Sequence, residues 1–170
     1  MENIEVNKIE TNKTKTTRQR QTALRHSNFF ITINSNKSVN KLTQEQQEAE
    51  ITRFEEVIDK LYNQELRNMI TLTSTKTEGS MVGVELMDRI VKAKVEYVVE
   101  IGPSKGLIHS HGLFALSHRA LNVKINIPKL RDEFLPTELG YYCYLDIKVY
   151  SDATASLQEY IQKTSDRHNL

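Results

Sequence analysis

The chain lacks the features on which disulfide-bonded, secreted and membrane-spanning proteins depend. Its 170 residues include one cysteine, Cys143, and no tryptophan. An internal disulfide and a CxxC-type zinc site are therefore excluded, which favours a reducing intracellular compartment. No apolar run reaches the roughly 18 residues of a membrane span, and the N-terminus is too polar for a signal peptide. We expect neither secretion nor membrane insertion.

The residues that are present are typical of one globular domain with an uneven charge distribution. Hydrophobic residues make up 38% and charged residues 26% of the chain, and the net charge is +1. Residues 11–26 nevertheless carry five basic residues and no acidic one, whereas residues 43–70 carry seven acidic and three basic residues. We expect residues 1–26 to form a disordered basic leader. Such a leader is either a solvated terminus or a contact for nucleic-acid phosphates.

The first half of the folded region combines a strand with a long helix. Residues 28–34 are rich in β-forming side chains and end in a turn-prone Asn-Ser-Asn sequence, which predicts a strand. Helical spacing of apolar residues predicts an amphipathic helix from Thr43 to about Met69, with Thr43 and Gln46 as a capping box. A polar stretch follows at residues 71–80. Residues 81–91 fit either a strand or a short helix.

The second half is predicted to contain a hairpin and two more helices. We expect a hairpin formed by strands at residues 94–101 and 107–116 and a turn at 102–106. A short helix at 128–135 and a strand at 141–150 should follow. A final helix, capped by Asp152, is expected at 151–164. Strands mixed with helices, with at least one hairpin, indicate an α+β fold. We expect an antiparallel sheet of about five strands with helices packed on it.

Two histidines mark a candidate metal site. His109 and His111 are two apart in a predicted strand, so their side chains leave the same face. Glu100 ends the preceding strand, directly across the turn, and is the expected third ligand; Glu96, further from the turn, is the weaker candidate. This ligand set suits Mg²⁺ or Mn²⁺ bound to phosphate oxygens, and it can also hold Zn²⁺ or Fe²⁺. Without a third ligand, such a pair is more often two exposed or hydrogen-bonded histidines.

The final helix carries a candidate nucleophile. Tyr160 and Lys163 are three apart, so a phenol and an ammonium group share one helical face and can address the same phosphate. A tyrosine can form a covalent intermediate, and a metal ion with a nearby cation assists its attack. The alternative is that Leu157 and Ile161 dock this helix on the sheet and Tyr160 only completes the edge of the core.

Three short motifs together resemble the replication initiators (Rep proteins) of small circular single-stranded DNA viruses, within the HUH endonuclease superfamily. The aromatic strand at residues 29–35 resembles the first motif of that family. His109-Ser110-His111 resembles the second motif, although the superfamily usually has a bulky hydrophobic residue where Ser110 stands. Tyr160-Ile161-Gln162-Lys163 resembles the third. The motifs occur in the order of the family, and the resemblance covers about residues 27–165.

The resemblance implies an endonuclease domain of HUH/Rep fold, with RRM-like topology, at residues 27–170, and a C-terminal helicase domain that this chain does not include. It implies a divalent ion, Mn²⁺ or Mg²⁺, held by Glu100, His109 and His111. Tyr160 would attack the scissile phosphate to give a 5′-phosphotyrosine and a free 3′-hydroxyl that primes rolling-circle replication, while Lys163 positions the phosphate. Single-stranded DNA would cross the sheet, where the expected contacts are Phe30, Thr32, Asn34, Lys148 and the basic leader.

The same resemblance implies binding partners, while two other functions fit the same residues. The partners would be an origin stem-loop and host replication factors, in the host nucleus, with oligomers formed only by the complete protein. One rival is a non-catalytic single-strand binding module of RRM type, which needs exposed aromatics such as Phe29 or Phe30 and Phe114. Another rival is a metal-dependent hydrolase without a covalent step.

No P-loop pattern occurs in the chain. We interpret Cys143 as a core residue, and the remaining histidines as surface residues: His26, His118 and His168.

Overall fold

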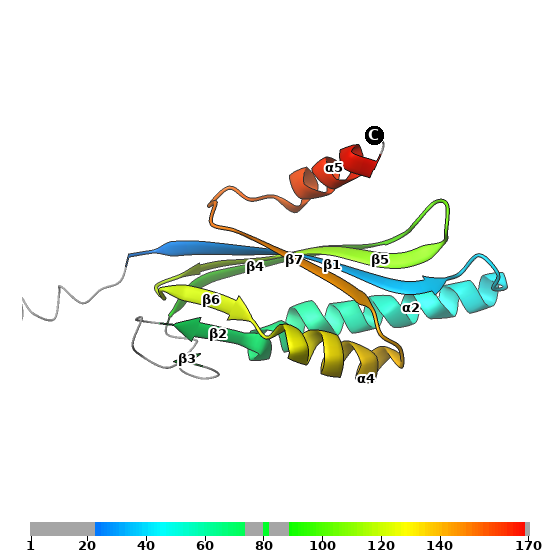
Figure 1. Ribbon diagram of the computed structural model, residues 1–170, viewed down its shortest axis with the longest axis horizontal. Coiled ribbons are helices and arrows are strands. Elements are labelled where there is room, and N and C mark those ends of the chain that lie inside the picture. Colours follow the sequence, from blue (N-terminus) through cyan, green and yellow to red (C-terminus); the bar gives the residue numbers. More distant parts are fainter. Residues whose placement is uncertain (1–22, 74–79, 82–88, 169–170) are drawn as a thin grey trace, which may run out of the picture.

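The computed structural model describes residues 23–73, 80–81 and 89–168. The fold is α+β, as predicted, with helices packed on an antiparallel sheet (Figure 1). The main sheet has the strand order β4-β5-β1-β7, formed by β1 (Arg25–Ser38), β4 (Ile90–Ile101), β5 (Leu107–His118) and β7 (Tyr144–Tyr150). A smaller sheet has the order β3-β2-β6, formed by β2 (Ile70–Thr73), β3 (Ser80–Met81) and β6 (Asn122–Ile125).

The main sheet and the helices that connect it follow the chain order β-α-β-β-α-β, with β1 and β5 in the centre. This is the split βαβ arrangement of ferredoxin-like folds, and it agrees with the predicted RRM-like topology. About five strands were expected in one sheet, whereas the described residues place four in the main sheet. The short strands β2 and β6 pair with each other instead of joining it.

The first helix, α2 (Gln44–Lys60), begins as predicted. The Thr43 side chain accepts a hydrogen bond from the Gln46 amide, and the Gln46 side chain accepts one from the Thr43 amide, so the capping box is confirmed. The single α-helix expected to reach Met69 is wrong in detail. A π-helical turn, Leu61–Glu65, and a 3₁₀ turn, Leu66–Met69, complete the segment. Both turns still bury apolar side chains against the sheet.

The predicted hairpin is confirmed. Strands β4 and β5 pair from Ile101 and Ile108 outward, and the Gly102 amide donates to the Leu107 carbonyl at the turn. Gly106 closes the turn with φ of 62°, a left-handed conformation that favours glycine. A side chain at that position would also collide with Asn40.

Helices cover the two faces of the main sheet unequally. Helix α2 and a second helical segment, a π-helical turn (Lys129–Phe134) followed by α4 (Leu135–Leu139), lie on one face (Figure 1). An ion pair between Lys60 Nζ and Glu138 Oε1, 2.8 Å long, links them. Helix α5 (Leu157–His168) lies on the opposite face and covers only part of it. The open part of this second face contains the candidate site.

A close approach between Tyr62 and Gly112 fixes β5 on its buried face. A Cβ atom at Gly112 would lie 1.8 Å from Tyr62 Oη, so only glycine fits there. The Tyr62 ring is buried and stacks on Tyr97, with centroids 5.1 Å apart. Since Gly112 follows His111 directly, this contact also holds the part of β5 that carries His111 close to the helical segment that contains Tyr62.

Several element boundaries differ from expectation. Strand β1 begins at Arg25, so the last two residues assigned to the leader belong to the sheet; residues 1–22 lie outside the described part. Strand β2 occupies the start of the stretch expected to be irregular, and most of residues 81–91 lies outside the described part. Helix α5 begins at Leu157, so Asp152 does not cap it. The Asp152 carboxylate instead accepts hydrogen bonds from the amide and hydroxyl of Thr154.

The assignment of His118 to the surface is wrong. Its side chain is 1% exposed, shares a 2.9 Å hydrogen bond with Ser27 Oγ, and accepts a hydrogen bond from the Ala120 amide. His26 is half-buried beside Ser117, and the side chain of His168 lies outside the described part. Cys143 is buried in the core, as expected. Among the described helices, none has both the length and the apolar character needed to cross a membrane.

Candidate metal centre

Strand register brings the predicted ligands onto one face of the sheet. Glu100 on β4 pairs with His109 on β5, which in turn pairs with Asn34 on β1. One step inward, His111 pairs with Thr32. Because side chains alternate along each strand, all of these residues point away from α2, to the side that α5 covers in part.

Glu100, His109 and His111 form a cluster that could hold a metal ion. Their ligand atoms all lie within 4.8 Å of one another, and Glu100 Oε2 lies 3.4 Å from His109 Nε2. Atoms that each lie about 2.1 Å from one ion are at most about 4.2 Å apart, so the cluster closes around an ion with movements below about an ångström. The prediction that these three residues meet is confirmed.

Glu96 stays outside this cluster. It pairs with Leu113, which lies on the same face of β5 two residues after His111. Its carboxylate forms an ion pair with Lys94, with an N···O distance of 2.7 Å. Glu100 is therefore the carboxylate that faces the histidines.

Hydrogen bonds orient both imidazole rings toward the cluster. His109 Nδ1 can donate to the Leu107 carbonyl oxygen, 3.2 Å away, which leaves Nε2, 3.4 Å from Glu100 Oε2, as the ring nitrogen available to a metal ion. His111 Nδ1 shares a 3.2 Å hydrogen bond with Thr32 Oγ1. Partners of this kind on the second ring nitrogen are typical of metal-binding histidines, because they fix the ring and its tautomer.

The electrostatic environment keeps His111 in its ligand form. Burial lowers the pKa of His111, and the neighbouring His109 lowers it further, while Glu100 opposes the shift. The neutral imidazole, which is the form that binds a metal, is therefore favoured at neutral pH.

Helix α5 places Tyr160 beside the histidines. The Tyr160 ring is 8% exposed and stacks on Phe30, with centroids 4.5 Å apart, and its centroid is 6.5 Å from that of His111. Leu157 and Ile161 pack in the same small apolar cluster, as the docking interpretation predicts. The same face of α5 therefore both docks the helix on the sheet and places Tyr160 close to the metal cluster.

The two lysines considered for phosphate contact lie in different places. Lys148 on β7 has its Nζ 5.8 Å from the centroid of the Tyr160 ring and 4.0 Å from Asp146 Oδ2. Lys163 is exposed and does not line the groove that contains the histidines. Its charge acts on Asp152, whose pKa is lowered mainly by the hydrogen bonds from Thr154 and to a smaller extent by His26 and Lys163.

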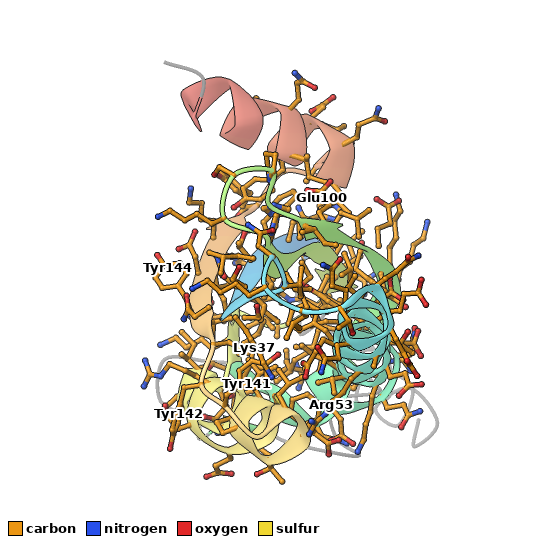
Figure 2. The ribbon with its side chains drawn as sticks, turned by 90° about the vertical axis from the view of Figure 1, so that its right-hand side faces the viewer. Lys37, Arg53, Glu100, Tyr141, Tyr142 and Tyr144 are labelled. Atoms are coloured by element: carbon orange, nitrogen blue, oxygen red, sulfur yellow. The ribbon has the colours of Figure 1, made fainter. Side chains whose placement is uncertain are left out.

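A groove of about 1370 Å³ surrounds the cluster. The hairpin turn 101–105 forms one wall, β7 forms the other, and Tyr160 closes one end. Tyr144, which lines the β7 wall, is 59% exposed, and Figure 2 shows it at one edge of the sheet, with Glu100 below α5. Sequence reasoning missed Tyr144 and Asp146. The alternation along β7 puts them on the same face as Lys148, but only the β1–β7 pairing places them beside Asn34 and Thr32.

The expected DNA contacts divide into two groups. Asn34 and Lys148 line the groove that surrounds the cluster. Phe30, at 3% exposed, is covered by Tyr160 and cannot stack on a base while α5 is docked. Thr32 borders the groove but is engaged with His111. The RRM-type reading needs exposed aromatics, yet Phe29 and Phe114 are buried in the core on the opposite face.

Comparison with known proteins does not assign the chain to a family. No protein-family model, no curated protein and no solved structure matches it. Its function therefore has to be inferred from the residues of the site.

Proposed function

We propose that this chain is a metal-dependent endonuclease that nicks and joins single-stranded DNA through a covalent tyrosine intermediate, as a domain of a replication initiator. The observation that carries the proposal is the position of Tyr160. A phenol that could serve as nucleophile lies on the same groove as three convergent metal ligands, with its ring 6.5 Å from that of His111. The three ligands come from the β4–β5 hairpin, whereas the phenol comes from α5, which lies far from that hairpin in sequence.

The donor set of the cluster fits a hard or borderline divalent ion. One carboxylate and two neutral imidazoles leave coordination positions open for phosphate oxygens, which suits Mn²⁺ or Mg²⁺. When bound, such an ion supplies a Lewis acid for a non-bridging oxygen of the scissile phosphate. Glu100, His109 and His111 would hold it, and Thr32 and the Leu107 carbonyl keep the two rings in position.

Tyr160 then attacks the phosphorus atom. The new bond joins the phenolic oxygen to phosphorus, the bond from phosphorus to the 3′ oxygen breaks, and the phenolic proton is lost to solvent while the departing 3′ oxygen gains one. The products are a 5′-phosphotyrosine and a free 3′-hydroxyl. Reversal of these steps with another 3′-hydroxyl rejoins the strand, so the energy of the phosphodiester bond is conserved.

Of Lys148 and Lys163, Lys148 is the better placed to meet the negative charge of the transferring phosphate. It projects into the groove next to the Tyr160 ring, whereas Lys163 lies outside the groove lining. A fixed positive charge at this point stabilises the transition state more than the bound substrate. Lys148 therefore takes the role that the third motif would give to Lys163.

The substrate we propose is single-stranded DNA at an origin stem-loop, in the nucleus of a host cell and with host replication factors as partners. The exposed ring of Tyr144 offers a stacking surface for a base next to the cleaved phosphate, a contact that tolerates any base. Asn34, on the groove floor, offers an amide for hydrogen bonds.

The test is covalent adduct formation. The protein is incubated with Mn²⁺ and a library of single-stranded stem-loops, and denaturing gels are run for protein bound to DNA. We expect an adduct with the wild type and with Tyr142→Phe, a control on an exposed tyrosine that does not line the groove, and none with Tyr160→Phe. Cleavage that survives in Tyr160→Phe would identify a hydrolase without a covalent step. Binding to the library without any cleavage would support a binding module instead.

A further inference from the structure

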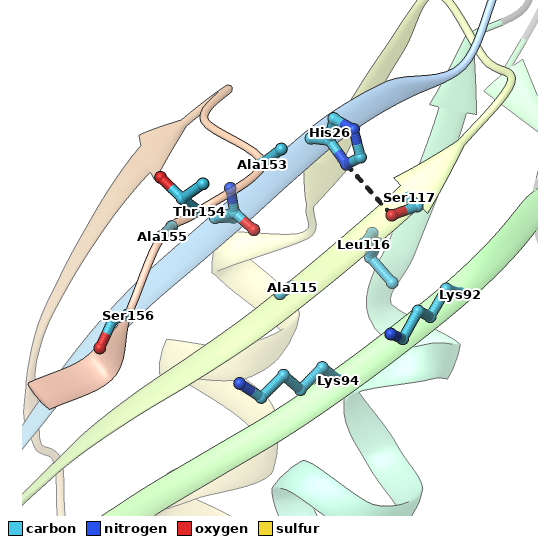
Figure 3. Close-up of a pocket in the computed structure, with 11 residues that line it drawn as sticks. His26, Lys92, Lys94, Ala115, Leu116, Ser117, Ala153, Thr154, Ala155 and Ser156 are labelled. Carbon is cyan, nitrogen blue, oxygen red and sulfur yellow. Dashed lines mark hydrogen bonds between the residues drawn. The ribbon is translucent and has the colours of Figure 1, made fainter.

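A second groove lies on the same face of the sheet, on the other side of the Phe30–Tyr160 contact. Figure 3 shows it between β4 and the loop that precedes α5. Its floor comes from Ala115, Leu116 and Ser117 on β5, and its volume is about 470 Å³. Lys92 and Lys94 project from β4 on one side, and residues 153–156 form the other side.

The shape of this groove suits a ligand that lies along it. Ala115, Ala153, Ala155 and Ser156 line it with short side chains, which leave space above the floor. Polar atoms are spread over its length instead of converging on one point, since His26 and Ser117 lie at one end and Ser156 at the other. An extended chain fits this distribution better than a compact small molecule.

The charge of the groove selects an anion. None of its lining residues is acidic, and two of them are lysines. Lys92 makes no ion pair with any residue in the described part of the chain. Lys94 pairs with Glu96, but both side chains are about half exposed, and such a pair exchanges readily for another anion. Asp152 lies at the start of the loop, where its carboxylate is held by Thr154.

An uncovered strip of β4 connects the two grooves. Helix α5 packs on Phe30 of β1 and on Leu113 of β5, so the same face of β4 stays open, and Val98 there is 37% exposed. From His111 to Ala115 the distance along β5 is four residues, or about 13 Å at about 3.3 Å per residue. Single-strand binding sites commonly cover about 4–16 nucleotides, so one strand can occupy both grooves.

We propose that this second groove binds the phosphate backbone of single-stranded DNA, at nucleotides beyond those held in the metal groove, through Lys92 and Lys94. The identity of the ligand rests on the proposed function, but the contact itself is one of binding and needs no cleavage. It lengthens the DNA footprint and fixes the direction in which the strand leaves the cleavage site, along β4 and around α5.

The test compares two lengths of DNA. Fluorescence anisotropy is measured in Tyr160→Phe protein without metal, with labelled single strands of about 4 and about 16 nucleotides. We expect Lys92→Gln/Lys94→Gln to bind the long strand roughly tenfold more weakly, and to reduce the salt slope of log K by about 0.7 for each lost phosphate contact. Binding of the short strand, which the metal groove alone accommodates, stays unchanged.

Lys124→Gln is the matched control, because Lys124 is exposed on β6 in the smaller sheet. An equal loss in that variant, or an equal loss for both strand lengths, would show a general charge effect and overturn the proposal. Unchanged binding of the long strand in the double variant would overturn it as well. If the wild type does not cleave DNA but the double variant still weakens only the long strand, the endonuclease proposal fails and the second groove stands.

Discussion

Tyr160 stacks on Phe30, with the two ring centroids 4.5 Å apart and the ring planes inclined by 24°. This contact joins the helix that carries the candidate nucleophile to the central strand of the sheet. Leu113 and Leu157 complete a small apolar cluster that is separate from the main core. The position of Tyr160 over the metal ligands thus depends on a few side chains.

Replacing Phe30 with leucine is expected to loosen α5 without unfolding the domain. Aromatic pairs contribute about 0.5–1.5 kcal/mol beyond their burial, which corresponds to a rate of adduct formation lower by roughly two- to twelvefold. The affinity for Mn²⁺, measured by calorimetry, stays the same, because Phe30 is neither a ligand nor one of the groups that hydrogen-bond to the two histidines. A variant with full adduct rate would show that the stack does not position the nucleophile.

Replacing Lys148 and Lys163 one at a time distinguishes their roles. Lys148→Gln is expected to slow adduct formation by about 10²-fold, the typical effect of removing one group that stabilises transition-state charge. Lys163→Gln, which leaves the groove lining intact, keeps a rate close to that of the wild type. Single-turnover rates at saturating DNA measure both, and Lys148→Arg, which keeps the charge, recovers part of the loss. The reverse order of effects would return the catalytic role to Lys163.

Thr32→Val tests the support of the metal ligands. Valine has nearly the shape of threonine but cannot hydrogen-bond to His111 Nδ1, so the ring loses its anchor. Loss of such a partner typically lowers metal affinity by about 10- to 100-fold. Titration with Mn²⁺ in wild type, Thr32→Val and His109→Ala should rank the affinities in that order. Equal affinities in the first two proteins would mean that Thr32 does not orient the ligand.

Buried His118 makes the domain sensitive to acid. Burial lowers its pKa in the folded chain, the backbone of Ala120 opposes the shift, and Arg25 and His26 add to the lowering. The unfolded chain therefore binds a proton first as the pH falls below about 6.5. The contribution of neutral His118 to the free energy of unfolding is thus fully present above that pH. It decreases as the pH falls toward the lowered pKa of His118 in the folded chain.

His118→Asn removes this proton uptake while keeping an acceptor for the Ala120 amide. Urea unfolding at a series of pH values should show a shallower loss of stability below about pH 6.5 than in the wild type. His26→Asn, at a less buried histidine, is the control. If His118→Asn and the wild type lose stability in parallel, His118 is not the titrating group.

The metal ligands could be predicted from the sequence because their geometry is local. Glu100, His109 and His111 lie on two strands joined by a short turn, so strand alternation and hairpin pairing nearly determine their arrangement. The capping box at Thr43 was predictable for the same reason, since its two partners are three residues apart.

The rest of the site depends on contacts between distant parts of the chain. Lys148 and Tyr144 reach the groove through the pairing of β7 with β1, and no local pattern specifies that register. Lys163 lies outside the groove because α5 docks on the sheet through Leu157, Tyr160 and Ile161, a tertiary contact that helical spacing alone does not specify. The burial of Phe30 and His118 likewise results from tertiary packing, which propensity and spacing do not encode.

The most direct measurement identifies the atom to which DNA becomes attached. Wild-type protein is treated with Mn²⁺ and a cleavable single-stranded stem-loop, the adduct is digested with protease and nuclease, and the modified peptide is sequenced by mass spectrometry. The mechanism predicts one modified residue, Tyr160, carrying a 5′-linked nucleotide, and no modified peptide when Mn²⁺ is omitted. Cleaved DNA without a protein adduct, or an adduct on another residue, would contradict it.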